Sequence, residues 1–305
     1  MKRVLSFFKY LFKEPSYIID KLVRKFNFLL PDKQYLSIVY WLAFKKRLNW
    51  NNPETYNEKL NWLKVYDRRP IYTTMVDKLA AKEYVKSIIG EKYIIPTFGV
   101  WERGEDIDWD ILPNQFVLKT THGAGNSGVV ICKDKVALDK EKTIKKLNKS
   151  LATDVYSRSR AFPYKNIKRQ IIAEQYIESR NGDLPDYKFF AFDGDVKALF
   201  VATERASGDV KFDFFDADFK HLDIVQIHPM SGKVFEKPQC FQEMLEVARK
   251  LSKGYPHIRV DLYDVDGSVY FGELTLYHHS GIVPFHPESW DHVFGSWLTL
   301  PDYEA

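Results

Sequence analysis

The first third of the chain carries apolar residues at the spacing of amphipathic helices. Within residues 1–50 they recur at i, i+3 and i+4 in three stretches, 4–12, 17–30 and 35–48. Lysine and arginine residues surround the apolar positions of the first stretch, and Pro31 closes the second. The pattern therefore predicts a helical N-terminal region over residues 1–50.

The next segment, residues 51–115, is predicted to begin the body of the protein. Thr55 is followed three residues later by Glu58. This is the spacing of a capping box, so the pair predicts the start of a helix. A second helix is expected over residues 77–89, ended by Gly90.

From residue 116 onward the spacing changes to the alternation that is typical of β-strands. Asp193-Gly194 and Asp266-Gly267 are turn dipeptides that favour β-hairpins. Hairpins mixed with helices indicate an α+β fold, and residues 116–305 form the third predicted segment. The expected elements are helices over 140–151 and 242–253 and strands over 116–119, 128–132, 171–177, 187–194, 196–203, 210–217, 258–264 and 269–277.

Composition narrows the class of protein. The 305 residues are 45% hydrophobic and 28% charged, which are values of a globular chain and exclude a disordered or coiled-coil protein. The two cysteines, Cys132 and Cys240, lie far apart and form no CxxC motif. A structural zinc site, an iron–sulfur centre and a disulfide scaffold are therefore not expected. This cysteine usage is typical of a cytoplasmic protein, and the strand pattern places Cys132 in the core.

The net charge of +4 is unevenly distributed. Residues 1–50 contain 11 basic and 3 acidic residues, whereas the remaining chain contains 34 basic and 38 acidic residues. A basic face over the whole protein is not expected, so nucleic acid is not a predicted partner. The basic and apolar positions of residues 1–30 favour peripheral contact with the inner face of the cell membrane. Docking of this segment on the protein body is the alternative.

A glycine-rich loop follows the predicted strand over 116–119. Glycines allow backbone N–H groups to approach phosphate oxygens closely, and a lysine at the strand end adds a point charge. A polyphosphate site is one interpretation of this pattern, and a plain glycine-rich hairpin is the other. The candidate residues are Lys119, His122, Gly123, Gly125, Ser127 and Gly128.

Two carboxylates and an arginine lie on the last predicted hairpin. In strand alternation Arg259 and Asp261 share one face, and Glu273 and Thr275 share one face of the returning strand. The hairpin turn can bring Asp261 and Glu273 side by side, where their charges favour a cation such as Mg²⁺ between them. A surface hairpin with a cross-strand Arg–Glu pair is the alternative.

The predicted strand over 171–177 has apolar walls and nearby carboxylates. These features suit an adenine ring and its ribose hydroxyls, although they also describe an ordinary amphipathic edge strand. The candidate residues are Glu174, Tyr176, Ile177 and Glu178, with Asp186 and Lys188 at the beginning of the following strand.

In their order along the chain, these pieces resemble the ATP-grasp fold. The closest resemblance is to the TupA-like ATP-grasp family of bacterial proteins associated with surface polysaccharides. It covers roughly residues 50–301. The runs that carry it are NPETYNEKLNWLKVYDR (52–68), VDKLAAKEYV (76–85), LPNQFVLKTTHGAGNSGV (112–129) and GELTLYHHSGIVPF (272–285).

The resemblance implies two lobes that clamp ATP, preceded by the helical N-terminal region. Lys119 would contact the α-phosphate side, and the loop over 122–128 would close over the β- and γ-phosphates. Lys188 would also contact the nucleotide. Residues 174–178 would hold the adenine, and Asp186 or Glu178 would bind the ribose.

The resemblance also implies the metal and transfer residues. Arg259 would stabilise the transferring phosphoryl group, while Asp261 and Glu273 would hold Mg²⁺. Typical ATP-grasp ligases have an Asn where this chain has Thr275. Thr275 is the weaker Mg²⁺ ligand of the two, so the number of metal ions stays open. Arg205 and His278 lie where an acceptor is expected, and His278 or His279 is a candidate base for an attacking amine.

The expected activity is Mg-ATP-dependent ligation of a carboxylate and an amine through an acyl-phosphate. The resemblance suggests a sugar, uronate or polysaccharide-linked carboxylate and an amino acid as the two substrates in surface-polysaccharide synthesis. Alternatives are phosphorylation of a sugar hydroxyl on the same fold and a non-catalytic scaffold that binds ATP or polysaccharide. The remaining alternative is a glycosyltransferase that uses an Asp-x-Asp motif, at Asp216/Asp218 or Asp264/Asp266.

Overall fold

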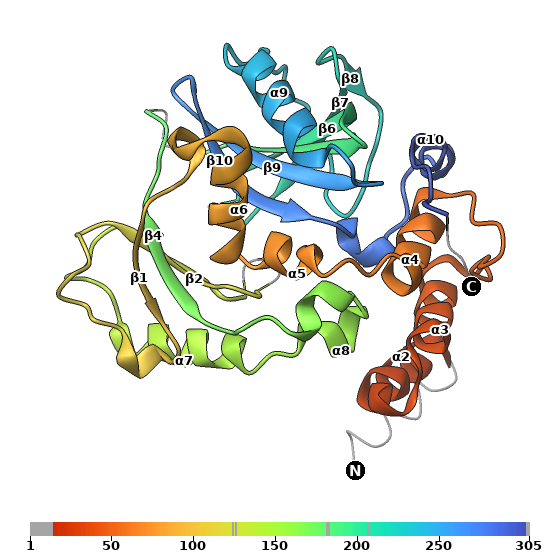
Figure 1. Cartoon of the computed structure of the whole chain (residues 1–305), viewed down its shortest axis with the longest axis horizontal. Helices are drawn as coiled ribbons and strands as arrows, with labels where there is room; N and C mark the ends of the chain where they lie inside the picture. Colours follow the sequence, from red (N-terminus) through yellow and green to blue (C-terminus); the bar gives the residue numbers. More distant parts are fainter. Residues whose placement is uncertain (1–14, 124, 126, 181–183, 206–207, 303–305) are drawn as a thin grey trace.

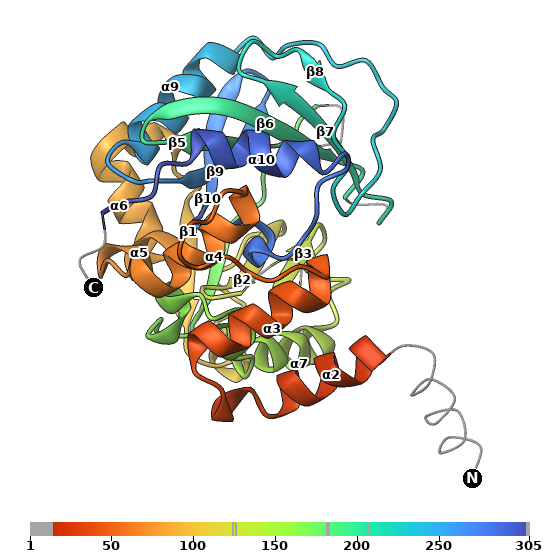
Figure 2. The same ribbon diagram turned by 90° about the vertical axis from the view of Figure 1, so that its right-hand side faces the viewer.

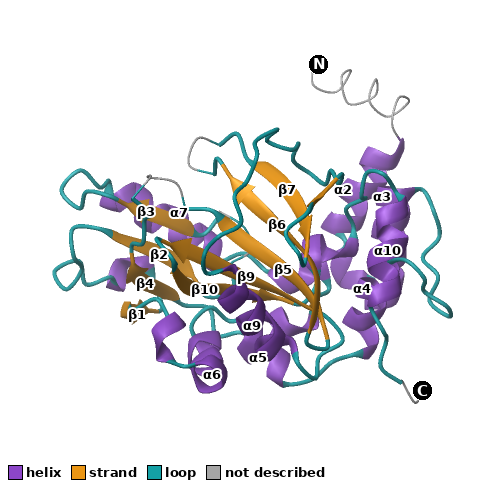
Figure 3. Ribbon diagram, turned by 90° about the horizontal axis from the view of Figure 1, so that it is seen from above, coloured by secondary structure: helices purple, strands orange, loops and turns teal. Residues whose placement is uncertain are grey.

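Two antiparallel sheets form the body of the molecule in the computed structural model, and helices surround them (Figures 1 and 3). The structure describes residues 15–302 apart from 124, 126, 181–183 and 206–207. The predicted helix over 4–12 lies outside these residues. Helices and antiparallel strands together confirm the predicted α+β class.

The smaller sheet has the strand order β1-β4-β2-β3. Helix α7 (Lys140–Leu151) covers it from one side and coincides with the predicted helix (Figure 1). A separate core that includes Phe116, Leu118, Leu147 and Ile171 fills the space between them. The strands are β1 (Thr97–Trp101), β2 (Phe116–Thr120), β3 (Val129–Cys132) and β4 (Ile171–Gln175).

The larger sheet has the strand order β10-β9-β5-β6-β7-β8. Its strands are β5 (Asp186–Phe192), β6 (Asp195–Thr203), β7 (Lys211–Asp216), β8 (His221–Leu222), β9 (Ile258–Val265) and β10 (Ser268–Thr275). Both predicted hairpin turns are present, because Asp193-Gly194 and Asp266-Gly267 connect paired strands with positive φ angles. Such turns match the right-handed twist of the strands that they join.

Helices pack on both faces of the larger sheet. Phe189 and Phe190 are neighbours in β5 and therefore point to opposite faces. Phe189 contacts Phe241 of α9 (Phe241–Ser252), whereas Phe190 contacts Phe294 of α10 (Ser289–Trp297) with ring centroids 5.0 Å apart. Fully buried aromatic residues thus join the sheet to both helix layers, which makes this lobe the larger hydrophobic core.

Helix α4 (Tyr56–Tyr66) begins at the predicted capping box. The Glu58 backbone N–H donates to Thr55 Oγ1, and the Glu58 carboxylate accepts from the Thr55 backbone N–H at 3.1 Å. Helix α10 packs against this end so closely that a Cβ added at Gly295 would lie 2.2 Å from the Glu54 carbonyl oxygen. Local capping and tertiary packing therefore define the same boundary.

The remaining helices connect the lobes and form the N-terminal region. Helices α2 (Pro15–Lys25) and α3 (Asp32–Phe44) correspond to the second and third predicted stretches and lie at one end of the molecule (Figure 2). Helix α6 begins at Ala80 rather than at residue 77, because the Asp77 carboxylate accepts from the Leu79 and Ala80 backbone N–H groups before the helix begins. The bounds are α5 (Ile71–Val76), α6 (Ala80–Ile89), α8 (Val155–Ser159) and the 3-10 turns η1 (Asn27–Leu29), η2 (Glu91–Tyr93), η3 (Gly104–Asp106), η4 (Phe162–Lys165) and η5 (His278–Gly281).

Candidate active site

A cavity of about 670 Å³ is lined by residues from both sheets. Pockets of this size hold ligands as large as a nucleotide. The predicted site residues that line it are Lys119, Gly125, Glu174, Tyr176, Ile177, Asp186, Lys188, Arg205, Asp261 and Glu273. His122, Gly123, Ser127, Gly128, Glu178, Arg259, Thr275 and His278 are not among its lining residues.

Lys119 extends from β2 into the cavity and is fixed by Glu174 on the neighbouring strand β4. The Lys119 Nζ lies 2.5 Å from Glu174 Oε2, and Lys82 of α6 lies 2.6 Å from Glu174 Oε1. Burial would raise the pKa of Glu174, but the charges of Lys119 and Lys82 outweigh it and hold the pKa below its usual value. Glu174, a residue only 4% exposed, therefore positions a lysine in addition to lining the pocket.

The glycine-rich loop packs tightly against the end of β2. A Cβ added at Gly128 would lie 2.3 Å from both Ser150 Oγ and Thr120 Oγ1, and one at Gly123 would lie 2.5 Å from Thr120 Oγ1. A side chain at either position would require the Thr120 or Ser150 hydroxyl group to move. His122 is buried beneath the loop, where burial and the charge of Arg169 lower the pKa of its imidazole.

The opposite wall of the cavity is formed by a cluster of charged groups on β5 and β9. Lys188 is paired in register with Asp261, and its Nζ contacts the carboxylates of both Asp261 and Asp186. Arg259 donates to both oxygens of Asp261 at 2.7 and 2.8 Å. Asp186 also accepts from Arg205 at 2.6 Å. Cations from two strand positions and one loop residue thus surround two buried carboxylates.

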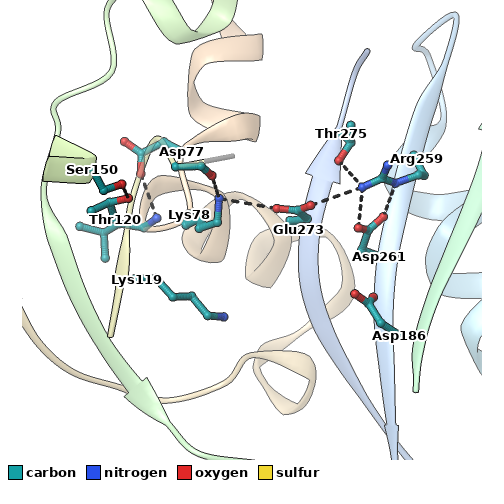
Figure 4. Close-up of polar contacts among 12 residues, drawn as sticks. Asp77, Lys78, Lys119, Thr120, Ser150, Asp186, Arg259, Asp261, Glu273 and Thr275 are labelled. Atoms are coloured by element: carbon teal, nitrogen blue, oxygen red, sulfur yellow. Dashed lines mark hydrogen bonds and ion pairs between the residues drawn. The ribbon is translucent and has the colours of Figure 1, made fainter. Parts of the chain in front are cut away.

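Glu273 faces Asp261 across the hairpin, as predicted. The two are direct cross-strand partners, and a register shift between Phe271 and Glu273 precedes this pair. The Glu273 carboxylate is 38% exposed and lies 3.6 Å from Lys78 Nζ and 3.4 Å from Arg259 Nη2 (Figure 4). Burial would raise its pKa, but Lys78, Lys188 and Arg259 outweigh this effect and lower it.

These donors fit a divalent cation of the Mg²⁺ type. Mg²⁺ is usually held by one or two protein carboxylates together with phosphate and water oxygens. Glu273 has loose ion pairs and opens into the cavity, and Asp261 also lines the cavity while it accepts hydrogen bonds from Arg259 and contacts Lys188. Thr275 Oγ1 accepts from Arg259 Nη2 at 3.0 Å, so this hydroxyl orients the guanidinium. Within the described ranges no group of three or more His, Cys, Asp or Glu residues gathers as a separate metal cluster.

His278 lies behind Arg259, on the turn η5 that follows β10. Its Nδ1 lies 2.8 Å from Arg259 Nη1 and its Nε2 lies 2.7 Å from Gln226 Oε1, and its side chain is buried. Burial, His279 and Arg259 hold the pKa of His278 well below its usual value. Both ring nitrogens are occupied in this arrangement.

Three residues that hold the charged or polar groups discussed above were not predicted from the sequence. Lys78 lines the cavity, donates to the Gly123 carbonyl and pairs with Glu273, so that it connects the two lobes (Figure 4). Lys82 holds Glu174, and Gln226 holds His278. Both lysines fall within the motif run 76–85, but no local pattern distinguishes them from surface lysines of an amphipathic helix.

The geometry defines a nucleotide-sized cleft between two antiparallel sheets, with lysines on one wall and carboxylates on the other. The sequence profile described as TupA-like ATPgrasp matches residues 58–299. The chain therefore belongs to the TupA-like ATP-grasp family, which confirms the family and the ATP-grasp class of enzyme predicted from the motifs. No curated protein sequence matches the chain.

Solved structures of ligases resemble the chain at low identity. A D-alanine–D-alanine ligase from Bacillus anthracis has 19% identity and a TM-score of 0.40, over 67% of this chain and 57% of that one. An L-amino acid ligase from Bacillus licheniformis has 15% identity and a TM-score of 0.44, over 83% of this chain and 57% of that one. A D-alanine–D-alanine ligase from Helicobacter pylori has 15% identity and a TM-score of 0.44, over 80% and 69%. The chain thus spans little more than half the length of two of these three proteins.

Proposed function

We propose that this protein is an Mg-ATP-dependent ligase that activates a carboxylate as an acyl-phosphate and joins it to an amine. The observation that carries the proposal is the arrangement of charged residues around the cavity. Lys119 lies on one wall, and Lys188, Asp261 and Glu273 lie on the opposite wall. Phosphoryl transfer needs positioned cations around three equatorial oxygens and no protein nucleophile. The cavity offers such cations from both sheets.

Each residue has a proposed task. Lys119, fixed by Glu174, would bind the α-phosphate side, and the loop 122–128 would cover the β- and γ-phosphates. Residues 174–178 would hold the adenine. Mg²⁺, when bound, would neutralise phosphate charge, and Glu273 with Asp261 would hold it. Arg259 and Lys188 would stabilise the group in transfer.

The substrate classes are a finer part of the proposal. We propose a sugar, uronate or polysaccharide-linked carboxylate and an amino acid or other amine, used in synthesis of a cell-envelope or capsule polysaccharide. The support is the TupA-like family membership together with Arg205, a cation that lines the cavity beside Asp186 and suits an anionic acceptor. The protein would act in the cytoplasm.

The experiment that tests the proposal is trapping of the acyl-phosphate. The protein is incubated with Mg-ATP, hydroxylamine and a panel of uronates and amino acids, and hydroxamate and phosphate are measured. We expect equal amounts of both, dependent on one carboxylate and lost in Lys119→Ala. Phosphorylated sugar without hydroxamate would replace the ligase with a phosphotransferase.

The glycosyltransferase alternative has little support from the geometry. The Asp216 carboxylate accepts from the Asp218 and Lys220 backbone N–H groups, and Asp264 accepts from the Gly267 N–H. These carboxylates satisfy their own turns and are not among the residues that line the cavity. A thermal shift caused by Mg-UDP-sugars and absent with Mg-ATP would reverse this assignment.

We also propose that the end of α2 and the turn between α2 and α3 contact an anionic membrane surface. Their apolar side chains are unusually exposed, with Leu22 at 50%, Phe26 at 42%, Phe28 at 74% and Leu29 at 67%. Basic residues Lys21, Arg24 and Lys25 lie on either side of Leu22 and before Phe26, a combination that suits an anionic bilayer. No helix among the described residues is long and apolar enough to span a membrane.

Flotation with lipid vesicles tests this contact. We expect the full chain to bind vesicles that contain phosphatidylglycerol and not those of phosphatidylcholine alone. The double variant Phe28→Ser/Leu29→Ser should lose binding, and Val136→Ser, which changes an apolar residue that is 93% exposed elsewhere, should retain it. Absence of binding by the full chain, or binding unchanged in the double variant, would refute the contact.

A further inference from the structure

One face of helix α4 forms hydrogen bonds to residues 280–283, which follow His278 closely in the chain. Asn57, Asn61 and Lys64 are spaced by four and three residues and therefore lie on the same side of the helix. All three are buried. Their side chains donate to the segment 280–283, from Asn57 to the Val283 carbonyl (3.2 Å), from Asn61 to the Gly281 carbonyl (2.7 Å) and from Lys64 to the Ser280 carbonyl (2.7 Å) and hydroxyl (2.8 Å).

This segment has an unusual backbone that needs such support. His279, Ser280 and Gly281 have φ angles of 43°, 57° and 61°, three consecutive residues in the left-handed region. Residues with side chains pay a free-energy cost in this region, and the conformation persists only where the surroundings determine it. A Cβ at Gly281 would lie 2.8 Å from Asn61 Nδ2, so the turn sits directly on the helix.

The hydrogen bonds of His278 assign its protonation state. Arg259 has only donors, so His278 Nδ1, at 2.8 Å, must accept and carries no proton. The proton of the neutral ring is then on Nε2, which donates to Gln226 Oε1. Gln226 in turn donates through Nε2 to the Val283 carbonyl, the same oxygen that Asn57 contacts. The network therefore closes on the segment that α4 holds.

We propose that His278 is a positioning residue that orients Arg259 toward Asp261 and Glu273. Gln226 and the polar face of α4 hold the His278 ring as the neutral Nε2–H tautomer. This role replaces the catalytic base that the sequence suggested for His278. The ring lone pair that a base would need, on Nδ1, accepts the hydrogen bond from Arg259. The catalytic consequence rests on the proposed function, in which Arg259 stabilises the group in transfer. The tautomer of His278 and the orientation of Arg259 do not depend on the proposed function.

The first test reads the tautomer directly. In protein labelled with ¹⁵N-histidine, the nitrogen shifts of His278, assigned with the His278→Asn variant, are followed from pH 5.5 to 8.5. We expect an unprotonated Nδ1 and a protonated Nε2 throughout. A protonated Nδ1, or titration of the ring in this range, would overturn the proposal whether or not the protein is a ligase. Gln226→Glu should create such a titration, since a carboxylate favours the imidazolium.

The second test separates positioning from base catalysis. An Asn side chain can place its Oδ1 near the position of the lost Nδ1 and still accept from Arg259, whereas Leu cannot. We expect His278→Leu to lower kcat by about 100-fold with little change in the dissociation constant of Mg-ATP, and His278→Asn to restore most of it. The pH profile of the Asn variant should keep its shape. An equal loss of kcat in both variants, together with loss of the acidic limb of the pH profile, would instead identify His278 as a catalytic base.

A matched pair of lysines on α4 tests the role of the helix. Lys64 and Lys59 both donate to main-chain carbonyls, but Lys59 contacts those of Gly295 and Leu298 in the C-terminal segment. We expect Lys64→Met to lower kcat and to perturb the ¹⁵N shifts of His278, while Lys59→Met changes neither. Identical effects of the two variants would mean that α4 acts on stability alone.

Discussion

Glu273 lies directly opposite Asp261 because Gly272 is an extra residue in β10. From the turn as far as the pair Leu262 and Phe271, the hairpin has regular register, and continued register would place Gly272 opposite Asp261. The bulge shifts the pairing by one residue. A slip of one residue exchanges the faces of a strand, so the bulge brings the Glu273 carboxylate to the face of Asp261 and Arg259.

Replacement of Glu273 by Gln should abolish turnover and preserve the fold. The substitution keeps the shape of the side chain and removes the charge that Lys78 and Arg259 face. We expect at least about a 100-fold loss of phosphate release and a weaker dependence of nucleotide binding on Mg²⁺. The control Glu102→Gln changes an exposed carboxylate that pairs with Lys168, and it should behave as wild type. A fully active Glu273→Gln would disprove the metal assignment.

Loss of Lys119 should remove nucleotide binding without unfolding the protein. Saturation with a ligand at about 100 times its dissociation constant stabilises a protein by about 2.7 kcal/mol. Wild type should therefore show a clear rise in Tm with Mg-ATP, and Lys119→Met should show none. Lys168→Met serves as the control because its side chain is 68% exposed and pairs with Glu102. A Tm shift that survives in Lys119→Met would place the nucleotide elsewhere.

Replacement of Glu174 by Gln should destabilise the smaller lobe. Removal of one partner from a buried ion pair costs about 3–5 kcal/mol, because the remaining charges are left uncompensated. Here the buried Lys82 and the half-buried Lys119 would face each other without a carboxylate. Unfolding by urea should show the loss, and Mg-ATP binding should weaken too. Unchanged stability would mean that the lysines find other acceptors.

The loop glycine Gly128 should tolerate no side chain. An added methyl group would lie 2.3 Å from Ser150 Oγ and Thr120 Oγ1, which are hydrogen-bonded to each other at 2.8 Å. Gly128→Ala should therefore displace the loop and weaken Mg-ATP binding, as measured by calorimetry. Gly232→Ala, at a glycine with open space around it and a φ of 70°, tests whether backbone strain in a loop elsewhere has the same effect.

The stability of the protein should rise with pH above neutrality because of Lys64. Burial lowers the pKa of Lys64 to about 7, whereas an unfolded lysine titrates near about 10.4. Between these values the unfolded chain holds a proton that the folded chain has released, so the free energy of unfolding increases by about 1.4 kcal/mol per pH unit. Below pH 7 this contribution is constant. Unfolding of wild type and Lys64→Met at several pH values measures it, and equal slopes would contradict it.

The parts of the fold that depend on neighbouring residues were predictable from the sequence. Thr55 and Glu58 lie within one helical turn, so their spacing alone predicts the capping box that the structure contains. Helix 140–151 and both Asp-Gly hairpin turns follow from equally local signals. Lys119 was predicted because it ends a strand before the glycine-rich loop, and Arg259 was predicted because strand alternation places it on the face of Asp261.

Contacts between distant segments could not be predicted in the same way. Lys78 meets Glu273 across the cleft, and α4 meets the turn after β10 more than 200 residues later in the chain. No periodicity distinguishes Lys64 from a solvated helix lysine, although it is fully buried. The role of His278 could not be predicted either, because it depends on Gln226, which lies in a loop without a motif.

The position of Lys78 has a consequence for the energetics of nucleotide entry. Its ammonium group faces Glu273 where a divalent cation is proposed to bind, so the arriving metal would displace one positive charge from that carboxylate. The exchange raises the charge beside Glu273 by one, because a divalent cation replaces a monovalent one. Mg-ATP also carries a smaller negative charge than metal-free ATP, so its affinity should vary less with ionic strength than the affinity for metal-free ATP, which must be drawn to the lysines by its full charge.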